Sequence, residues 1–119
     1  MRPVPFSMTV QKGDEEICVT CSGEFDLAVA DRFRDAIDAV LHEQPRRLHF
    51  ECSGIEFIDS IGMRAFMHTA TRCRDARILM TIDMSPRMRQ VFDTVGVTAL
   101  FNPSSQAPEV CAESDAVPV

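Results

Sequence analysis

The sequence predicts an α/β layer fold, in which helices pack against a face of one sheet. Apolar residues recur at every second position in some segments and at helical spacing in others, and turn residues separate these segments at regular intervals. The length of 119 residues suits one domain with one hydrophobic core. We therefore expect residues 6–102 to form a domain with the order strand, strand, helix, strand, helix, strand, helix.

The first part of this domain predicts a hairpin and a helix. Strands are expected at residues 6–10 and 16–22, and the second of these has apolar residues at alternate positions. Asp26 is placed to cap a helix, because apolar residues then recur four, seven and eight positions after Phe33. We expect Pro45 to mark the end of this hairpin and helix.

The middle of the domain predicts a strand at residues 48–52 that ends at Ser53 and Gly54, followed by a short apolar piece at residues 55–58. A second helix is expected to begin near Ser60 and to end near Arg74.

The last part predicts a strand at residues 78–82 and a third helix. Ser85 followed by Pro86 is a strong helix start, and Gly96 supplies a left-handed stop. We expect Leu100 and Phe101, together with Val97, to cover the edge of the core.

The two ends of the chain lack periodicity. Residues 1–5 and the acidic, Pro- and Ser-rich tail at 103–119 are expected to be flexible. No apolar run approaches the roughly 18 residues of a membrane span, and the first six residues contain no hydrophobic signal core. The expected location is the cytoplasm.

Five cysteines are spread widely along the chain, and their odd number and spacing favour reduced thiols over a disulfide scaffold. Cys18 and Cys21 are the only close pair. Their odd separation points them to opposite faces of a strand, so they cannot share a metal ion. We expect no metal site.

The charge balance disfavours a nucleic-acid partner. The net charge is −6, and the chain has no Trp and no Tyr that could stack on bases. Six arginines between residues 64 and 89 are best explained as solvated helix faces.

Catalysis is also disfavoured. Asp59, Ser60 and His68 are close in sequence, but eight helical residues separate Ser60 from His68 by about 12 Å along the axis. The nucleophile elbow and the phosphate-binding loop are both missing. His42 and His49 are isolated and predicted to be surface or core filler. We expect no enzyme activity, no catalytic residue and no cofactor.

The informative position is Ser60, where a strand gives way to a helix. A hydroxyl here is suited to an ordinary helix cap, worth about 1 kcal/mol. The same position also suits a phosphate, because unpaired N–H groups and the helix dipole favour negative charge at this place. The position alone leaves both interpretations open.

Three separate motifs in this chain resemble motifs of a known domain family. SGEFDL at 22–27, FIDSIG at 57–62, and SPRMRQVF at 85–92 with VGV at 95–97 occur in the order found in the STAS domain family. In particular, residues 6–102 resemble the free-standing bacterial anti-sigma factor antagonists, or anti-anti-sigma factors. The resemblance implies a small mixed β-sheet with helices packed against it, and no catalytic activity.

The resemblance also implies a partner-switching role in transcription regulation and stress response. The unphosphorylated protein would bind an anti-sigma factor serine kinase and release a sigma factor, phosphorylation of Ser60 would prevent binding, and a phosphoserine phosphatase would reset the switch. The implied partner surface comprises Asp26, Asp59, Ser60, Ile61, Gly62 and Met63. Many family members carry a second hydroxyl and then Gly-Leu after the phosphoacceptor, whereas Ile61 and Met63 flank Gly62 here.

Two other classes of function remain as alternatives. One is a STAS accessory or scaffold subunit of a transporter, lipid-transport or signalling complex, with Ser60 serving only as a helix cap. The other is a small hydrolase, which requires a histidine brought to Ser60 from elsewhere. The single apolar stripes of the helices favour a monomer when the protein is free.

Overall fold

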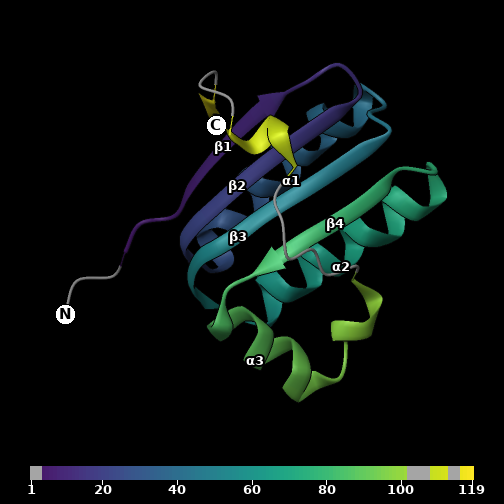
Figure 1. Cartoon of the computed structure of the whole chain (residues 1–119). Helices are drawn as coiled ribbons and strands as arrows, with labels where there is room; N and C mark the ends of the chain where they lie inside the picture. The colour runs from purple at the N-terminus through teal and green to yellow at the C-terminus, as the bar shows by residue number, and fades with distance from the viewer. Residues whose placement is uncertain (1–3, 102–107, 113–115) are drawn as a thin grey trace.

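A five-stranded mixed sheet forms the centre of the computed structural model, which describes residues 4–101, 108–112 and 116–119 (Figure 1). The strand order is β4-β3-β2-β1-β5, with β2, β3 and β4 parallel and β1 antiparallel to both of its neighbours. The strands are β1 (Ser7–Lys12), β2 (Glu16–Phe25), β3 (Arg47–Ile58), β4 (Leu79–Met84) and β5 (Val117–Pro118). This architecture confirms the predicted fold class.

Three α-helices connect and cover the strands. They are α1 (Leu27–His42), α2 (Ser60–Asp75) and α3 (Pro86–Val95). In Figure 1, α1 and α2 lie behind the sheet, and α3 lies beyond the end of β4. None of the helices in the described part of the chain is long and apolar enough to cross a membrane.

The helix ends follow the local signals in the sequence. Asp26 caps α1 by accepting a hydrogen bond from the Ala28 amide at 3.0 Å, and Ser85 caps α3 through the Met88 amide at 3.0 Å. Gly96 ends α3 with φ of 84°, a left-handed conformation that glycine adopts at little cost. The three predicted boundary residues are confirmed.

Aromatic side chains fill the space between the sheet and the two helices behind it. Phe25 of β2 and Phe50 of β3 meet Phe33 of α1 and Phe66 of α2, with ring centroids 4.9 to 6.1 Å apart. All four are almost fully buried. Burial of each such side chain contributes roughly 1.5–3 kcal/mol, so this cluster fixes α1 and α2 on the sheet.

Two predicted details of the domain are wrong. β3 continues through Ser53 and Gly54 to Ile58, because pairing with β2 resumes after an irregularity at this point and carries the chain onward. Leu100 does not cover the core, since 57% of it remains exposed after the short helix η1 (Thr98–Leu100). Phe101 does cover the core, where it packs 5.2 Å from the Phe92 ring.

The prediction that all cysteines are reduced is also wrong. Cys18 forms a disulfide with Cys111, 93 residues away, and only Cys21, Cys52 and Cys73 are free. The pairing arises because the chain returns to the sheet after α3, which no local pattern in the sequence reveals. Cys18 and Cys21 do point to opposite faces of β2, as expected, since Cys21 belongs to the core cluster.

The described parts of the C-terminal tail contain two short elements that the sequence does not predict. The tail forms the short helix η2 (Glu109–Ala112), and β5 then adds to the edge of β1. Residues 1–3, 103–107 and 113–115 of the predicted flexible ends lie outside the described residues, as does residue 102 at the end of the predicted domain.

Candidate functional site

The predicted site lies where the parallel strands β2 and β3 end side by side. Phe25 and Ile58 are register partners at these ends, and the Asp59 amide donates a hydrogen bond to the Phe25 carbonyl at 3.3 Å. Asp26 and Asp59 directly follow the two paired residues. Because adjacent strands are about 4.8 Å apart, the structure brings these two carboxylate-bearing residues together next to Ser60.

Asp59, and not Ser60, caps helix α2. The Asp59 carboxylate accepts a hydrogen bond from the Gly62 amide at 2.9 Å, and its backbone is extended, as a cap requires. Ser60 is the first residue of the helix. The interpretation of Ser60 as a helix cap is therefore wrong by one position, because the choice depends on the backbone conformation at residue 59.

The Ser60 side chain is exposed, and its hydroxyl makes no hydrogen bond to any residue that the structure describes. The hydroxyl is thus available to a second molecule without the loss of an internal contact. The amino end of α2 also carries the positive end of the helix dipole, which favours an added negative charge. This geometry is compatible with phosphorylation of a folded domain.

The three residues after Ser60 are less accessible than Ser60 itself. Ile61 is half-buried, whereas Gly62 is buried and 9% of Met63 is exposed. A Cβ atom at Gly62 would lie 2.6 Å from Cδ1 of Phe25 and 2.8 Å from Cγ1 of Ile58. Gly62 is accordingly a packing residue, whose lack of a side chain lets α2 approach the core.

Two exposed apolar side chains near the helix caps Asp26 and Asp59 were not predicted from the sequence as part of the site. Leu27, directly after Asp26, is 70% exposed, and Phe57, two residues before Asp59, is 45% exposed. Both lie within the motifs quoted above and within two residues of a capping acid. This closeness to the caps is the sequence signal that could have revealed them. We call the set Asp26, Leu27, Phe57, Asp59 and Ser60 the Ser60 surface. It combines exposed apolar area with two carboxylates, a combination suited to protein binding.

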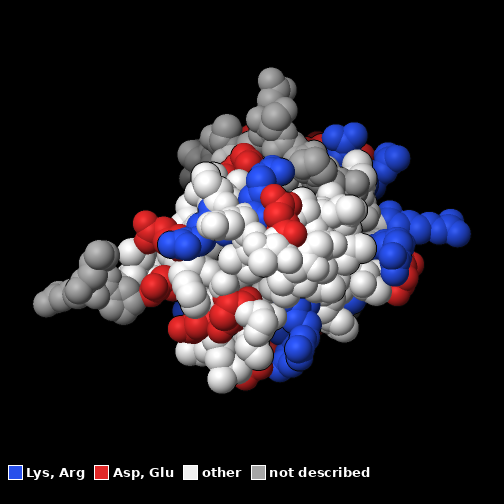
Figure 2. Space-filling model, turned by 90° about the horizontal axis from the view of Figure 1, so that it is seen from below, with Lys and Arg blue, Asp and Glu red and all other residues white. Residues whose placement is uncertain are grey.

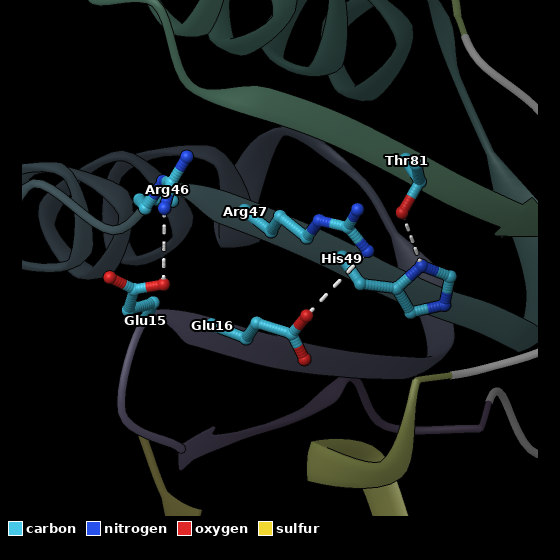
Figure 3. Close-up of polar contacts among 6 residues, drawn as sticks. All are labelled: Glu15, Glu16, Arg46, Arg47, His49 and Thr81. Atoms are coloured by element: carbon cyan, nitrogen blue, oxygen red, sulfur yellow. Dashed lines mark hydrogen bonds and ion pairs between the residues drawn. The ribbon is translucent and has the colours of Figure 1, made fainter.

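The face of the molecule shown in Figure 2 has no large basic patch among the residues that are described. Acidic side chains (red) and basic side chains (blue) lie around a broad uncharged area. At the amino ends of β2 and β3, Arg46 lies 3.4 Å from Glu15, and Arg47 lies 3.7 Å from Glu16 (Figure 3). These pairs lie at the opposite end of the strands from Ser60, so they do not contribute to its surface.

No histidine is placed to activate Ser60. His68 lies two turns along α2 on an exposed position, and His49 lies within β3 with Nδ1 2.7 Å from Oγ1 of Thr81 (Figure 3). Burial lowers the pKa of His49, although the nearby Glu51 and Asp83 carboxylates oppose this effect. The site therefore supplies an exposed hydroxyl but no base for nucleophilic catalysis.

Comparisons with known proteins agree with this architecture. The family model described as "Mlab, STAS domain" matches residues 8–102. An anti-sigma factor antagonist from Mycobacterium paratuberculosis superposes with a TM-score of 0.80 at 22% identity, over 93% of this chain and 95% of that one. No curated protein matches the chain in sequence.

Two further solved structures are of the anti-sigma factor antagonist SpoIIAA. Its unphosphorylated form gives a TM-score of 0.70 at 14% identity, over 83% of this chain and 89% of that one. The phosphorylated form of the Bacillus protein gives 0.65 at 17% identity, over 83% and 92%. At these identities the likeness establishes the fold alone.

Proposed function

The chain belongs to the STAS domain family, and from this premise we propose that it is an anti-sigma factor antagonist whose partner binding is switched off by phosphorylation of Ser60. The proposed partner is an anti-sigma factor with serine-kinase activity, and a phosphoserine phosphatase restores the binding form. The protein itself is not an enzyme in this proposal. It acts in the cytoplasm as a monomer when free, without direct contact with nucleic acid.

The single observation that carries this proposal is the state of Ser60. Its hydroxyl is exposed at the first position of α2, while Asp59 performs the capping that would otherwise explain a serine there. The similarity to SpoIIAA adds support, because solved structures exist of that protein both with and without phosphorylation. A fold of this type accommodates the modification in that relative.

The charges around Ser60 supply a mechanism for the switch. A phosphoserine carries a charge of about −1.5 to −2 at neutral pH, and here it is added beside the carboxylates of Asp26 and Asp59. A partner must desolvate this surface, and an unfavourable juxtaposition of like charges costs several kcal/mol. A penalty of about 3 kcal/mol weakens binding more than a hundredfold. The backbone need not move.

The same surface explains how the unphosphorylated form binds. Leu27 and Phe57 offer exposed apolar side chains for burial against a partner. Ile61, which is half-buried, extends this area along α2.

A pull-down from lysate of the native host tests the proposal. Wild type, Ser60→Asp and a matched control, Thr71→Asp, are compared, with bound proteins identified by mass spectrometry. Thr71 is also exposed on α2 but lies about 16 Å further along the helix axis, so its variant adds the same charge away from the site. Circular dichroism verifies that all three proteins are folded.

We expect wild type and Thr71→Asp to recover a kinase, and Ser60→Asp to recover at least a hundredfold less of it. Equal recovery of a transporter subunit or another non-kinase partner by all three proteins would contradict the switch. That result favours the accessory or scaffold function in its place.

A further inference from the structure

The face of the sheet that points away from α1 and α2 carries a row of polar side chains. Gln11, Cys18, His49 and Thr81 are register partners across β1, β2, β3 and β4. Gln11 is 5% exposed, His49 2% and Cys18 0%. Polar groups are rarely buried to this extent without a cover. Something other than the helices therefore shields this face.

A C-terminal strap, which we define as residues 108–112 and 116–119, supplies cover at β1 and β2. Figure 1 shows η2 in front of the sheet, on the side opposite α1 and α2. Val110 of η2 is 4% exposed, and a Cβ atom at Gly13 would lie 3.3 Å from its Cγ2. The disulfide then joins Cys111 to Cys18 of β2. Beyond it, the Val119 amide donates to the Met8 carbonyl at 2.9 Å.

Among the described residues, the strap buries little apolar surface besides the disulfide. Val110 is its one fully buried side chain among the described residues, and Val117 and Val119 remain 62% and 45% exposed. β5 contributes only two residues to the sheet. Ordering each residue of a backbone costs about 1–2 kcal/mol, which such limited burial offsets poorly. For the part of the strap that the structure describes, the covalent bond is thus the main attachment to the sheet.

We infer that Cys18 and Cys111 form a reversible redox site, and that reduction of their disulfide by a dithiol releases the C-terminal strap from β1 and β2. Release removes β5 from β1, which remains paired with β2 but becomes the edge strand of the sheet. Release also uncovers the part of the polar face at Cys18. An unpaired edge is able to accept a strand from another chain.

The exposure of the two sulfur-bearing residues sets the direction of attack. Cys111 is half-buried, whereas Cys18 is inaccessible. A thiolate of the reductant attacks Sγ of Cys111 and forms a mixed disulfide, while the Cys18–Cys111 bond breaks and Cys18 leaves as a thiolate that takes up a proton. The second thiol of the reductant then displaces Cys111. Two electrons are transferred, and the reductant becomes a disulfide.

The three remaining cysteines are not competitors for this chemistry. Cys21, Cys52 and Cys73 are all buried in the core. Burial raises the pKa of Cys52 well above its ordinary value and that of Cys73 to about 11. Since the thiolate is the reactive form, these thiols remain inert while the fold is intact.

The redox site and the Ser60 surface are separate. Cys18 precedes the end of β2 at Phe25 by seven residues, or about 23 Å along the strand. The inference does not depend on the proposed function, because neither the disulfide nor the strap involves Ser60. A protein that fails to bind a kinase can still show the redox transition.

The test uses the full chain equilibrated in mixtures of oxidised and reduced dithiothreitol. Free thiols are trapped by alkylation after an acid quench, and peptide mass spectrometry identifies the linked cysteines. Hydrogen–deuterium exchange is measured on the same samples in the peptides that contain Cys111 and Val119. Cys111→Ala removes the pair, and Cys73→Ala is the matched control that removes an unpaired cysteine.

We expect one bond, Cys18–Cys111, to form and break reversibly. Reduction should accelerate exchange in the strap at least tenfold while exchange in α1 and α2 is unchanged. Cys111→Ala should show the fast exchange under both conditions, and Cys73→Ala should behave as wild type. Absence of this bond in fully oxidised samples overturns the inference, as does a strap whose exchange is the same in oxidised and reduced wild type. The wild-type comparison is decisive even if a variant fails to fold.

Discussion

The assignment of the α2 cap to Asp59 makes opposite predictions for two adjacent residues. In Asp59→Ala, the Gly62 amide loses its acceptor, and the positive end of the helix dipole loses a nearby carboxylate. Loss of a cap costs about 1 kcal/mol, and loss of the charge about 0.5 kcal/mol more. We expect Asp59→Ala to lower the free energy of unfolding by about 1.5 kcal/mol.

Ser60→Ala should not be destabilising. The Ser60 hydroxyl has no hydrogen-bond partner among the described residues, and alanine has the higher helix propensity by up to about 0.5 kcal/mol. Asp59→Asn is a matched control, since asparagine keeps an acceptor oxygen but removes the charge. Its expected cost is about 0.5 kcal/mol.

Urea denaturation followed by circular dichroism provides the measurement, because the chain contains no Trp and no Tyr whose fluorescence could report unfolding. All variants should show an unchanged denaturant slope. A cost for Ser60→Ala as large as that for Asp59→Ala would show that Ser60 is the functional cap. An unchanged stability of Asp59→Ala would likewise contradict the assignment of the cap to Asp59.

Two further predictions concern buried positions. Gly62→Ala should cost about 1–3 kcal/mol in urea denaturation, because the new methyl group overlaps the Phe25 ring; a cost below about 0.5 kcal/mol would contradict the packing role. The pKa of His49 is lowered in the folded protein from its ordinary value of 6.5. The unfolded state therefore binds more protons than the folded state below pH 6.5, and the free energy of unfolding decreases as the pH is lowered. Unfolding measured at pH 7.5 and 5.5 should therefore show a larger loss for wild type than for His49→Gln, and equal losses would exclude this contribution.

The local features of this protein can be predicted from its sequence. Alternating and helical spacings placed the elements, and the capping residues Asp26, Ser85 and Gly96 marked three boundaries, because these signals act between residues a few positions apart. Three motifs together indicated the family, and the one around Ser60 indicated the position of the candidate site. The roles of the individual residues in this motif did not follow from the sequence, since a shift of one residue decides whether Asp59 or Ser60 is the cap.

Contacts between residues far apart in the chain could not be predicted in this way, because they depend on how the elements pack. The contact of Gly62 with Phe25 depends on how closely α2 approaches β2, and the exposure of Phe57 depends on β3 running on past Gly54. The Cys18–Cys111 disulfide depends on the return of the chain across the sheet after 93 residues. Spacing in the sequence carries no information about such a return, because it is fixed by packing and pairing across the whole fold.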